Sequence, residues 1–217
     1  MMTNLFSSFD PCTGKMSLNW MSTFIMILIM PMNFWVLKTK SSMVLIKLIN
    51  QLSKEMNMLM NNKESLIIIM SLFLMILINN MMGLIPYIFT SSSHLLFSLS
   101  MSLPLWFSFM LFGWINYTKK MFIHLVPMGT PSVLMPFMVL IETISNIIRP
   151  GSLAVRLTAN MIAGHMLMAL LGSNTQSMKL MSIMMFLLIT LMVFEMAVSM
   201  IQAYVFMTLT TLYSSEI

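Results

Sequence analysis

The stretch SLAVRLTANMIAGH, residues 152–165, places an arginine, an asparagine and a histidine inside an otherwise apolar segment. That segment extends over residues 132–171, well beyond the roughly 20 residues that a bilayer crossing requires. Charged side chains at membrane depth are costly, so they mark functional positions. The stretch therefore predicts a membrane helix that carries functional polar residues.

The whole chain shares this apolar character. Of its 217 residues 59% are hydrophobic and 8% are charged, and the mean hydropathy is +0.91. Soluble domains carry about 25% charged residues, so the composition predicts an all-α polytopic membrane protein with one membrane domain, residues 1–217. No cleaved targeting segment is expected from the first residues. The single cysteine, Cys12, cannot form an internal disulfide.

Five apolar stretches reach the length of a membrane span: residues 17–37, 65–85, 95–115, 132–171 and 178–213. The fourth would be about 60 Å long as a straight helix, against a hydrocarbon core of about 30 Å. It must tilt or bend, and Pro136 and Pro150 predict bends. Residues 132–213 therefore predict a hairpin of two long, tilted helices.

Residues 41–64 predict an amphipathic helix that lies in the membrane interface, with an ordinary solvated loop helix as the alternative. Lys47, Gln51 and Lys54 fall near one face of it. The apolar residues of another face are Leu45, Leu48, Leu52, Met56 and Leu59.

The lysines of the loops predict the orientation. The positive-inside rule places the lysine-rich side in the cytoplasm or matrix. The N-terminal segment, residues 1–16, is then outside and the C-terminus is inside. The side with few lysines has only Lys15 and Lys179, and the other has Lys38, Lys40, Lys47, Lys54, Lys63, Lys119 and Lys120.

Arg156 is the first candidate functional residue. A guanidinium group stays protonated in proteins, so it cannot relay protons and instead attracts a carboxylate. Asn160 falls on the same helix face. Ala159 and Ala163, like Asn160 and Gly164, are spaced by four, and small residues at that spacing admit a close neighbouring helix. The alternative for Arg156 is a structural arginine that is paired within the protein or snorkels to a lipid headgroup. The alternative for the small-residue face is packing within the same chain.

Titratable residues are predicted on both sides of Arg156. Glu142 lies about 21 Å along the helix toward the inside, and His165 about 13 Å toward the outside on roughly the opposite face. Glu195, in the next span, falls in the same outer half as His165. Histidine can relay protons at physiological pH. Two offset sets divided by a permanent cation predict proton entry and exit through separate half-channels.

Three further polar residues lie in the same two spans as the titratable residues. Ser199 and Gln202 continue a stripe from Glu195 at spacings of four and three. Arg149 lies on nearly the same face as Arg156 and is predicted to be a helper or an ion-pair partner. The alternatives are a stripe that serves packing, an interfacial Glu142 and a core His165.

The opening stretch, with IETISNIIRPGSLAVR leading into it, resembles subunit a of F-type ATP synthases, in the animal mitochondrial version. The resemblance continues through TNLFSSFDP, NNMMGLIPYIFTSSSH, FIHLVPMGTP and TLYSSE and covers nearly the whole chain. It implies a stator subunit in the mitochondrial inner membrane, with the N-terminus in the intermembrane space and the C-terminus in the matrix. The implied partners are the c-subunit ring, the stalk subunit b and small membrane subunits.

The resemblance also implies residue roles. Arg156 would face the carboxylates of the ring, and Glu142 would lie on the inner path. Bacterial members commonly carry glutamate at position 165 and histidine at 195, so this chain has the exchanged, mitochondrial arrangement. The residues implied to line or border the outer path are Asn160, His165, Glu195 and Gln202.

No catalytic, metal or cofactor site is expected, because no phosphate loop or nucleotide motif is present. ATP chemistry would then take place on other subunits. The net charge of +5 sets topology rather than nucleic-acid binding. One rival, a membrane subunit of a proton-pumping respiratory complex, predicts lysines in mid-span, whereas here they sit at span ends. The other, a structural assembly subunit, predicts no titratable stripe.

Overall fold

The computed structural model describes residues 5–12, 16–30, 38–60, 63–86, 88–126, 131, 133–173 and 181–216, and all regular structure in them is helical. The predicted all-α class is confirmed. The helices in chain order are η1 Leu5–Phe9, η2 Leu18–Phe24, α1 Ile25–Ile29, α2 Lys40–Leu59, α3 Lys63–Gly83, η3 Ser91–Ser93, α4 Leu95–Asn116, α5 Thr118–His124, α6 Met135–Ser173 and α7 Met181–Glu216.

Within the described residues, α3, α4, α6 and α7 are long and apolar enough to cross a membrane. Their bounds lie within a few residues of the predicted spans. The predicted first span differs, because its described part is the shorter apolar stretch Leu18–Ile29, which begins as a 3-10 helix. The rest of that span, residues 31–37, lies outside the described residues.

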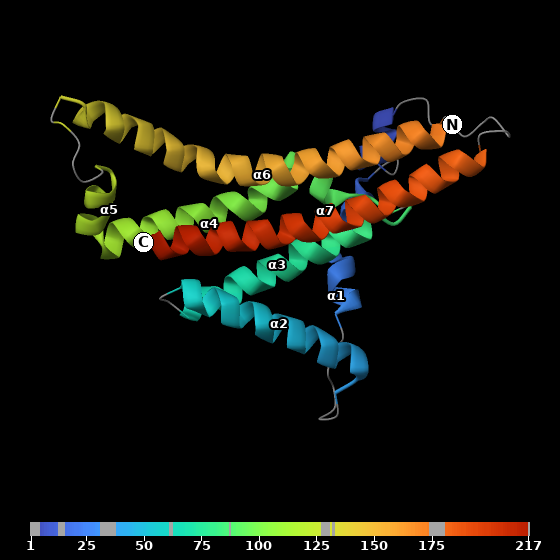
Figure 1. Cartoon of the computed structure of the whole chain (residues 1–217), viewed down its shortest axis with the longest axis horizontal. Coiled ribbons are helices and arrows are strands. Elements are labelled where there is room, and N and C mark those ends of the chain that lie inside the picture. Colours follow the sequence, from blue (N-terminus) through green and yellow to red (C-terminus); the bar gives the residue numbers. More distant parts are fainter. Residues whose placement is uncertain are drawn as a thin grey trace.

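The two longest helices, α6 and α7, lie side by side along the longest axis of the molecule (Figure 1). α4 packs against α6, and α3 against α7. α6 bows along its length and carries a buried Pro150 in its interior. The predicted bend at Pro136 is wrong, because this proline lies in the first turn of α6, where no intrahelical donor is lost.

One apolar core joins α2, α3, α6 and α7. Met56 of α2 and Met207 of α7 are almost fully buried in it, at 1% and 0% exposure. Because lipid chains are as apolar as this core, close packing rather than exclusion from water holds such helices together. The flexible methionine side chain suits that role, since it adapts to irregular gaps.

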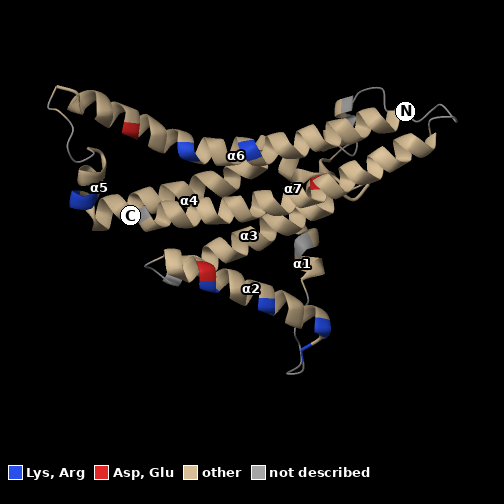
Figure 2. Cartoon of the chain, viewed as in Figure 1, with Lys and Arg blue, Asp and Glu red and all other residues tan. Residues whose placement is uncertain are grey.

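Helix α2 differs in detail from the predicted amphipathic segment. It ends at Leu59, and residues 63 and 64 belong to α3. Of the residues predicted on its apolar face, Met56 is buried in the core, whereas Leu48 and Leu59 are 51% and 44% exposed. The lysines of α2 are exposed, and lysines occur on α2 and α5 but not on α6, whose charged residues are one glutamate and two arginines (Figure 2).

Candidate functional site

Arg156 lies on the outer surface of the helix bundle. Its side chain is exposed, as are its neighbours Val155 and Ala159, one and three residues away on α6. The opposite face of the same helix is buried, with Leu153 and Leu157 in the core. Arg156 therefore points away from the other described helices, on a face of mostly small side chains.

Asn160, one turn after Arg156, is half-buried at the edge of this face. The small residues predicted to admit a neighbouring helix divide into two groups. Ala159 and Ala163 are exposed beside Arg156, whereas Gly164 is buried. Among the described residues, the small surface of α6 is therefore covered at Gly164 and open at Ala159 and Ala163.

Gly164 meets the carboxyl group of Glu195 on α7. A Cβ atom at position 164 would lie 2.6 Å from the Glu195 Cδ atom and would also collide with Oε1. Such a distance leaves no room for a methyl group. Helices α6 and α7 thus bring Glu195 directly against the turn of α6 that carries His165.

The polar atoms at this contact are buried without a protein partner. Among the described residues, His165 Nε2 and both carboxyl oxygens of Glu195 have no hydrogen-bond partner. Buried polar atoms in proteins are nearly always paired with protein groups or ordered water, so these atoms are free to bind water. The structure places Glu195 against Gly164, the residue that precedes His165 on α6.

The other two members of the α7 stripe lie further along the helix. Ser199 is buried, donates to the Met196 carbonyl at 2.8 Å and lies 3.3 Å from the Met81 sulfur on α3. Gln202 is half-buried. Ser199 therefore joins α7 to α3, which is a packing role that the sequence alone did not separate from transport.

Sequence reasoning missed a further set of buried polar residues. Most membrane hydroxyls here donate to their own helix, as Ser98 does to Leu95 on α4. Four other buried residues have side-chain polar atoms with no partner in the described part of the chain: Asn79, Asn80, Ser92 and Ser102. They lie on α3, η3 and α4, and η3 contacts both α3 and α4. The adjacent asparagines in an apolar span were the signal that could have found them.

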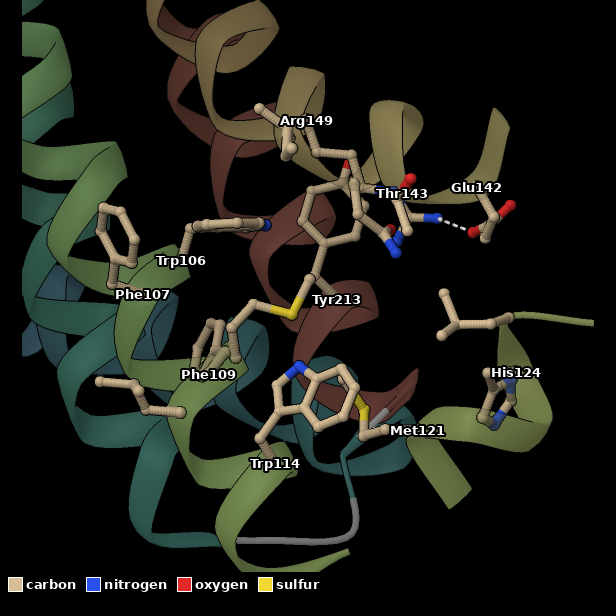
Figure 3. A pocket seen from close by; sticks show the side chains of 15 residues that line it. Trp106, Phe107, Phe109, Trp114, Met121, His124, Glu142, Thr143, Arg149 and Tyr213 are labelled. Atoms are coloured by element: carbon tan, nitrogen blue, oxygen red, sulfur yellow. Dashed lines mark ion pairs between the residues drawn. The ribbon is translucent and has the colours of Figure 1, made fainter. Parts of the chain in front are cut away.

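Toward the other end of α6, Glu142 and Arg149 form an ion pair of 3.7 Å (Figure 3). Arg149 is thus an ion-pair partner, and its guanidinium also lies 4.9 Å from the ring centroid of Tyr213. Both residues border a cavity of about 600 Å³. Most of its aromatic side chains come from α4 and include Trp106, Phe107 and Trp114. The cavity combines an aromatic wall with one charged pair.

No group of three or more histidine, cysteine, aspartate or glutamate side chains that could hold a metal ion occurs in the described ranges of the chain.

Comparison with known proteins gives a consistent result. The family model described as ATP synthase A chain matches residues 16–215. Similar curated proteins, each named ATP synthase subunit a, are those of Drosophila mauritiana and Locusta migratoria, both 56% identical, and of Anopheles quadrimaculatus, 54% identical. Each alignment covers 100% of this chain and 100% of the relative.

Proposed function

The chain belongs to the ATP synthase A chain family, and from this premise we propose how its polar residues carry protons. As a member it is a multi-pass protein of the mitochondrial inner membrane and a stator component of the proton-translocating membrane sector, associated with the rest of the ATP synthase complex. Our proposal is that Arg156 faces the carboxylates of a rotating c-subunit ring, between an outer and an inner proton half-channel.

The exposure of Arg156 is the observation that carries this proposal. A fixed cation on the lipid-facing surface of a membrane helix is costly unless an anion faces it. The exposed neighbours Ala159 and Ala163 leave space for another helix to come close. A ring of helices with one carboxylate each fits both the charge and the shape.

The outer half-channel consists of His165, Glu195, Gln202 and Asn160, and the unpaired polar atoms of Asn79 and Asn80 extend it. The buried side-chain atoms of His165 and Glu195, like those of Asn79 and Asn80, have no protein partner in the described part of the chain, which supports a role in passing protons. The inner half-channel passes Glu142, whose pairing with Arg149 keeps a carboxylate beside the large cavity. Ser199 is accessory, because it fixes α7 to α3.

Arg156 couples proton flow to rotation by electrostatics. It favours an ionised ring carboxylate in front of it, and that carboxylate must take up a proton before it enters lipid. Protons that arrive by one half-channel and leave by the other then bias the rotation. Each charge that crosses gains about 2.3 kcal/mol per 100 mV. The chain itself performs no ATP chemistry, which takes place on other subunits.

The remaining parts of the proposal concern organisation. Residues 1–217 form one membrane domain, with residues 1–16 in the intermembrane space, an interfacial helix within residues 41–64 and a proton-path hairpin at 132–213. The C-terminus faces the matrix. The stalk subunit b and small membrane subunits are the further partners.

Cysteine cross-linking tests the ring-facing surface. With Cys12 replaced by serine, a cysteine at Ala159 should form a disulfide with a cysteine on an outer helix of the ring when the intact complex is oxidised. Ala154 provides a matched control, because it lies on the same helix but is only 1% exposed. Cross-linking from position 154 but not from 159, in an assembled complex, would reverse the assigned face.

Thiol labelling tests the orientation. Cysteines at Lys47 and Lys54, both exposed on α2, should react with a membrane-impermeant reagent only from the matrix side. The native Cys12 is exposed and should react only from the opposite side. The measurement is labelling of intact mitoplasts and of inverted inner-membrane vesicles. Labelling of position 47 in mitoplasts would overturn the topology.

A further inference from the structure

The N-terminal helix η1 lies against α6, which is distant from it in the sequence (Figure 1). The ring of Phe9 stands edge-on to the His165 imidazole, with ring centroids 6.1 Å apart and planes at 89°. The next residue, Asp10, is exposed and accepts a hydrogen bond from the Cys12 backbone N–H at 3.0 Å. Phe9 is thus a partly buried residue that contacts the His165 ring, whose Nε2 is buried, and it directly precedes the exposed Asp10.

His94 holds Phe9 in this position. Its Nε2 lies 3.0 Å from the Phe9 carbonyl oxygen. Because a carbonyl can only accept, this nitrogen is the donor. The contact joins residues 85 positions apart in the sequence, so it determines where η1 lies rather than the helix's own conformation.

The His94 ring is itself fixed by its surroundings. It packs against the rings of Trp20 and Phe89, each with a centroid distance of 5.2 Å. The Ser22 hydroxyl donates to the Phe89 carbonyl at 3.1 Å, and this hydrogen bond joins η2 to the segment that precedes η3. His94 also directly precedes α4, whose first turn hydrogen-bonds to its carbonyl. A side chain held on several sides can fix the position of a short helix.

We propose that Phe9 controls the access of outer water to His165, and that His94 is the positioning residue that keeps Phe9 closed. The inference rests on the proposed function in one respect, that His165 carries protons on the outer path. In the closed position the Phe9 ring excludes bulk water from the imidazole. One hydrogen bond and a few ring contacts keep the Phe9 ring in this position. These interactions are weak enough for the ring to move away transiently by local opening of η1.

The reactivity of His165 toward diethyl pyrocarbonate tests this directly. The reagent acylates an accessible imidazole nitrogen and releases ethanol and carbon dioxide, and mass spectrometry measures the rate at each histidine. In the intact complex, at low overall modification, Phe9→Ala should accelerate modification of His165. His94→Ala should accelerate it by about fivefold, the factor expected from losing one hydrogen bond. His94→Gln keeps a donor for the Phe9 carbonyl and should stay near the wild-type rate.

Two further variants show whether the Phe9 ring itself shields His165 or whether any substitution in η1 exposes it. Phe6→Ala removes a ring of the same helix that is 66% exposed, so it should leave His165 unchanged. Phe9→Leu keeps apolar bulk and should remain close to wild type. Assembly on a native gel must be retained. An unchanged His165 rate in Phe9→Ala, or an equal acceleration in Phe6→Ala, would overturn the proposal. The experiment measures how fast the reagent reaches His165. Its result therefore does not depend on whether His165 carries protons.

Discussion

Replacing Arg156 by alanine should abolish proton-coupled ATP synthesis while the complex still assembles. The side chain is exposed and contributes nothing to the apolar core, so its loss removes charge without removing packing within the chain. Loss of a preorganised charge from an apolar site costs about 100-fold or more in rate. Without the cation a ring carboxylate can pass the subunit in protonated form, so passive proton leak should rise.

The measurement for Arg156→Ala is ATP synthesis and passive proton flux in reconstituted vesicles, with assembly checked on a native gel. Arg156→Lys should also fail to couple, because lysine lacks the planar fork and can be deprotonated in apolar surroundings. Val155→Ala is the matched control, since Val155 is 51% exposed on the same face and carries no charge. Normal coupled synthesis in an assembled Arg156→Ala complex would leave Arg156 a structural residue.

The sequence predicted the parts of the fold that depend on local composition. Apolar runs of membrane length placed α3, α4, α6 and α7 to within a few residues. The prediction succeeds because lipid offers no hydrogen-bond partners to the backbone. A long apolar segment that crosses the membrane therefore forms a helix, in which its backbone groups pair with one another. The short helix α5 was missed, because a seven-residue amphipathic turn has too little periodicity to stand out.

The sequence alone did not predict contacts between residues that are far apart along the chain. The Phe9–His94 hydrogen bond spans 85 positions, and no periodicity encodes it. The spacing of Asn160 and Gly164 predicted a close neighbour, but not that Gly164 would meet Glu195 while Ala163 faces outward. Periodicity fixes which residues share a helix face. It does not fix which neighbour that face meets, since that depends on how all the helices pack.

Gly164→Ala should impair proton transfer by displacing Glu195. The added methyl group would occupy the position of the carboxyl group, whose Cδ atom would lie 2.6 Å away. The carboxyl group is the far end of a flexible side chain, so it will rotate away before the two helices separate. A misplacement of about 1 Å at a reacting group can cost up to about 100-fold in rate. Coupled ATP synthesis and driven proton flux should therefore fall, while the amount of assembled complex should stay near normal.

A second substitution shows whether the Glu195 carboxyl group is the cause. Aspartate at position 195 is shorter by one methylene, about 1.5 Å, and so withdraws the carboxyl group from the new methyl group. The double variant Gly164→Ala with Glu195→Asp should then conduct protons better than Gly164→Ala alone. Gly172→Ala is the matched control on the same helix, because a Cβ there would meet nothing within 4 Å. If Gly164→Ala conducts like Gly172→Ala, the close contact of α6 with Glu195 serves packing alone. If it conducts poorly and the shorter acid restores flux, the position of this carboxyl group limits proton transfer on the outer path.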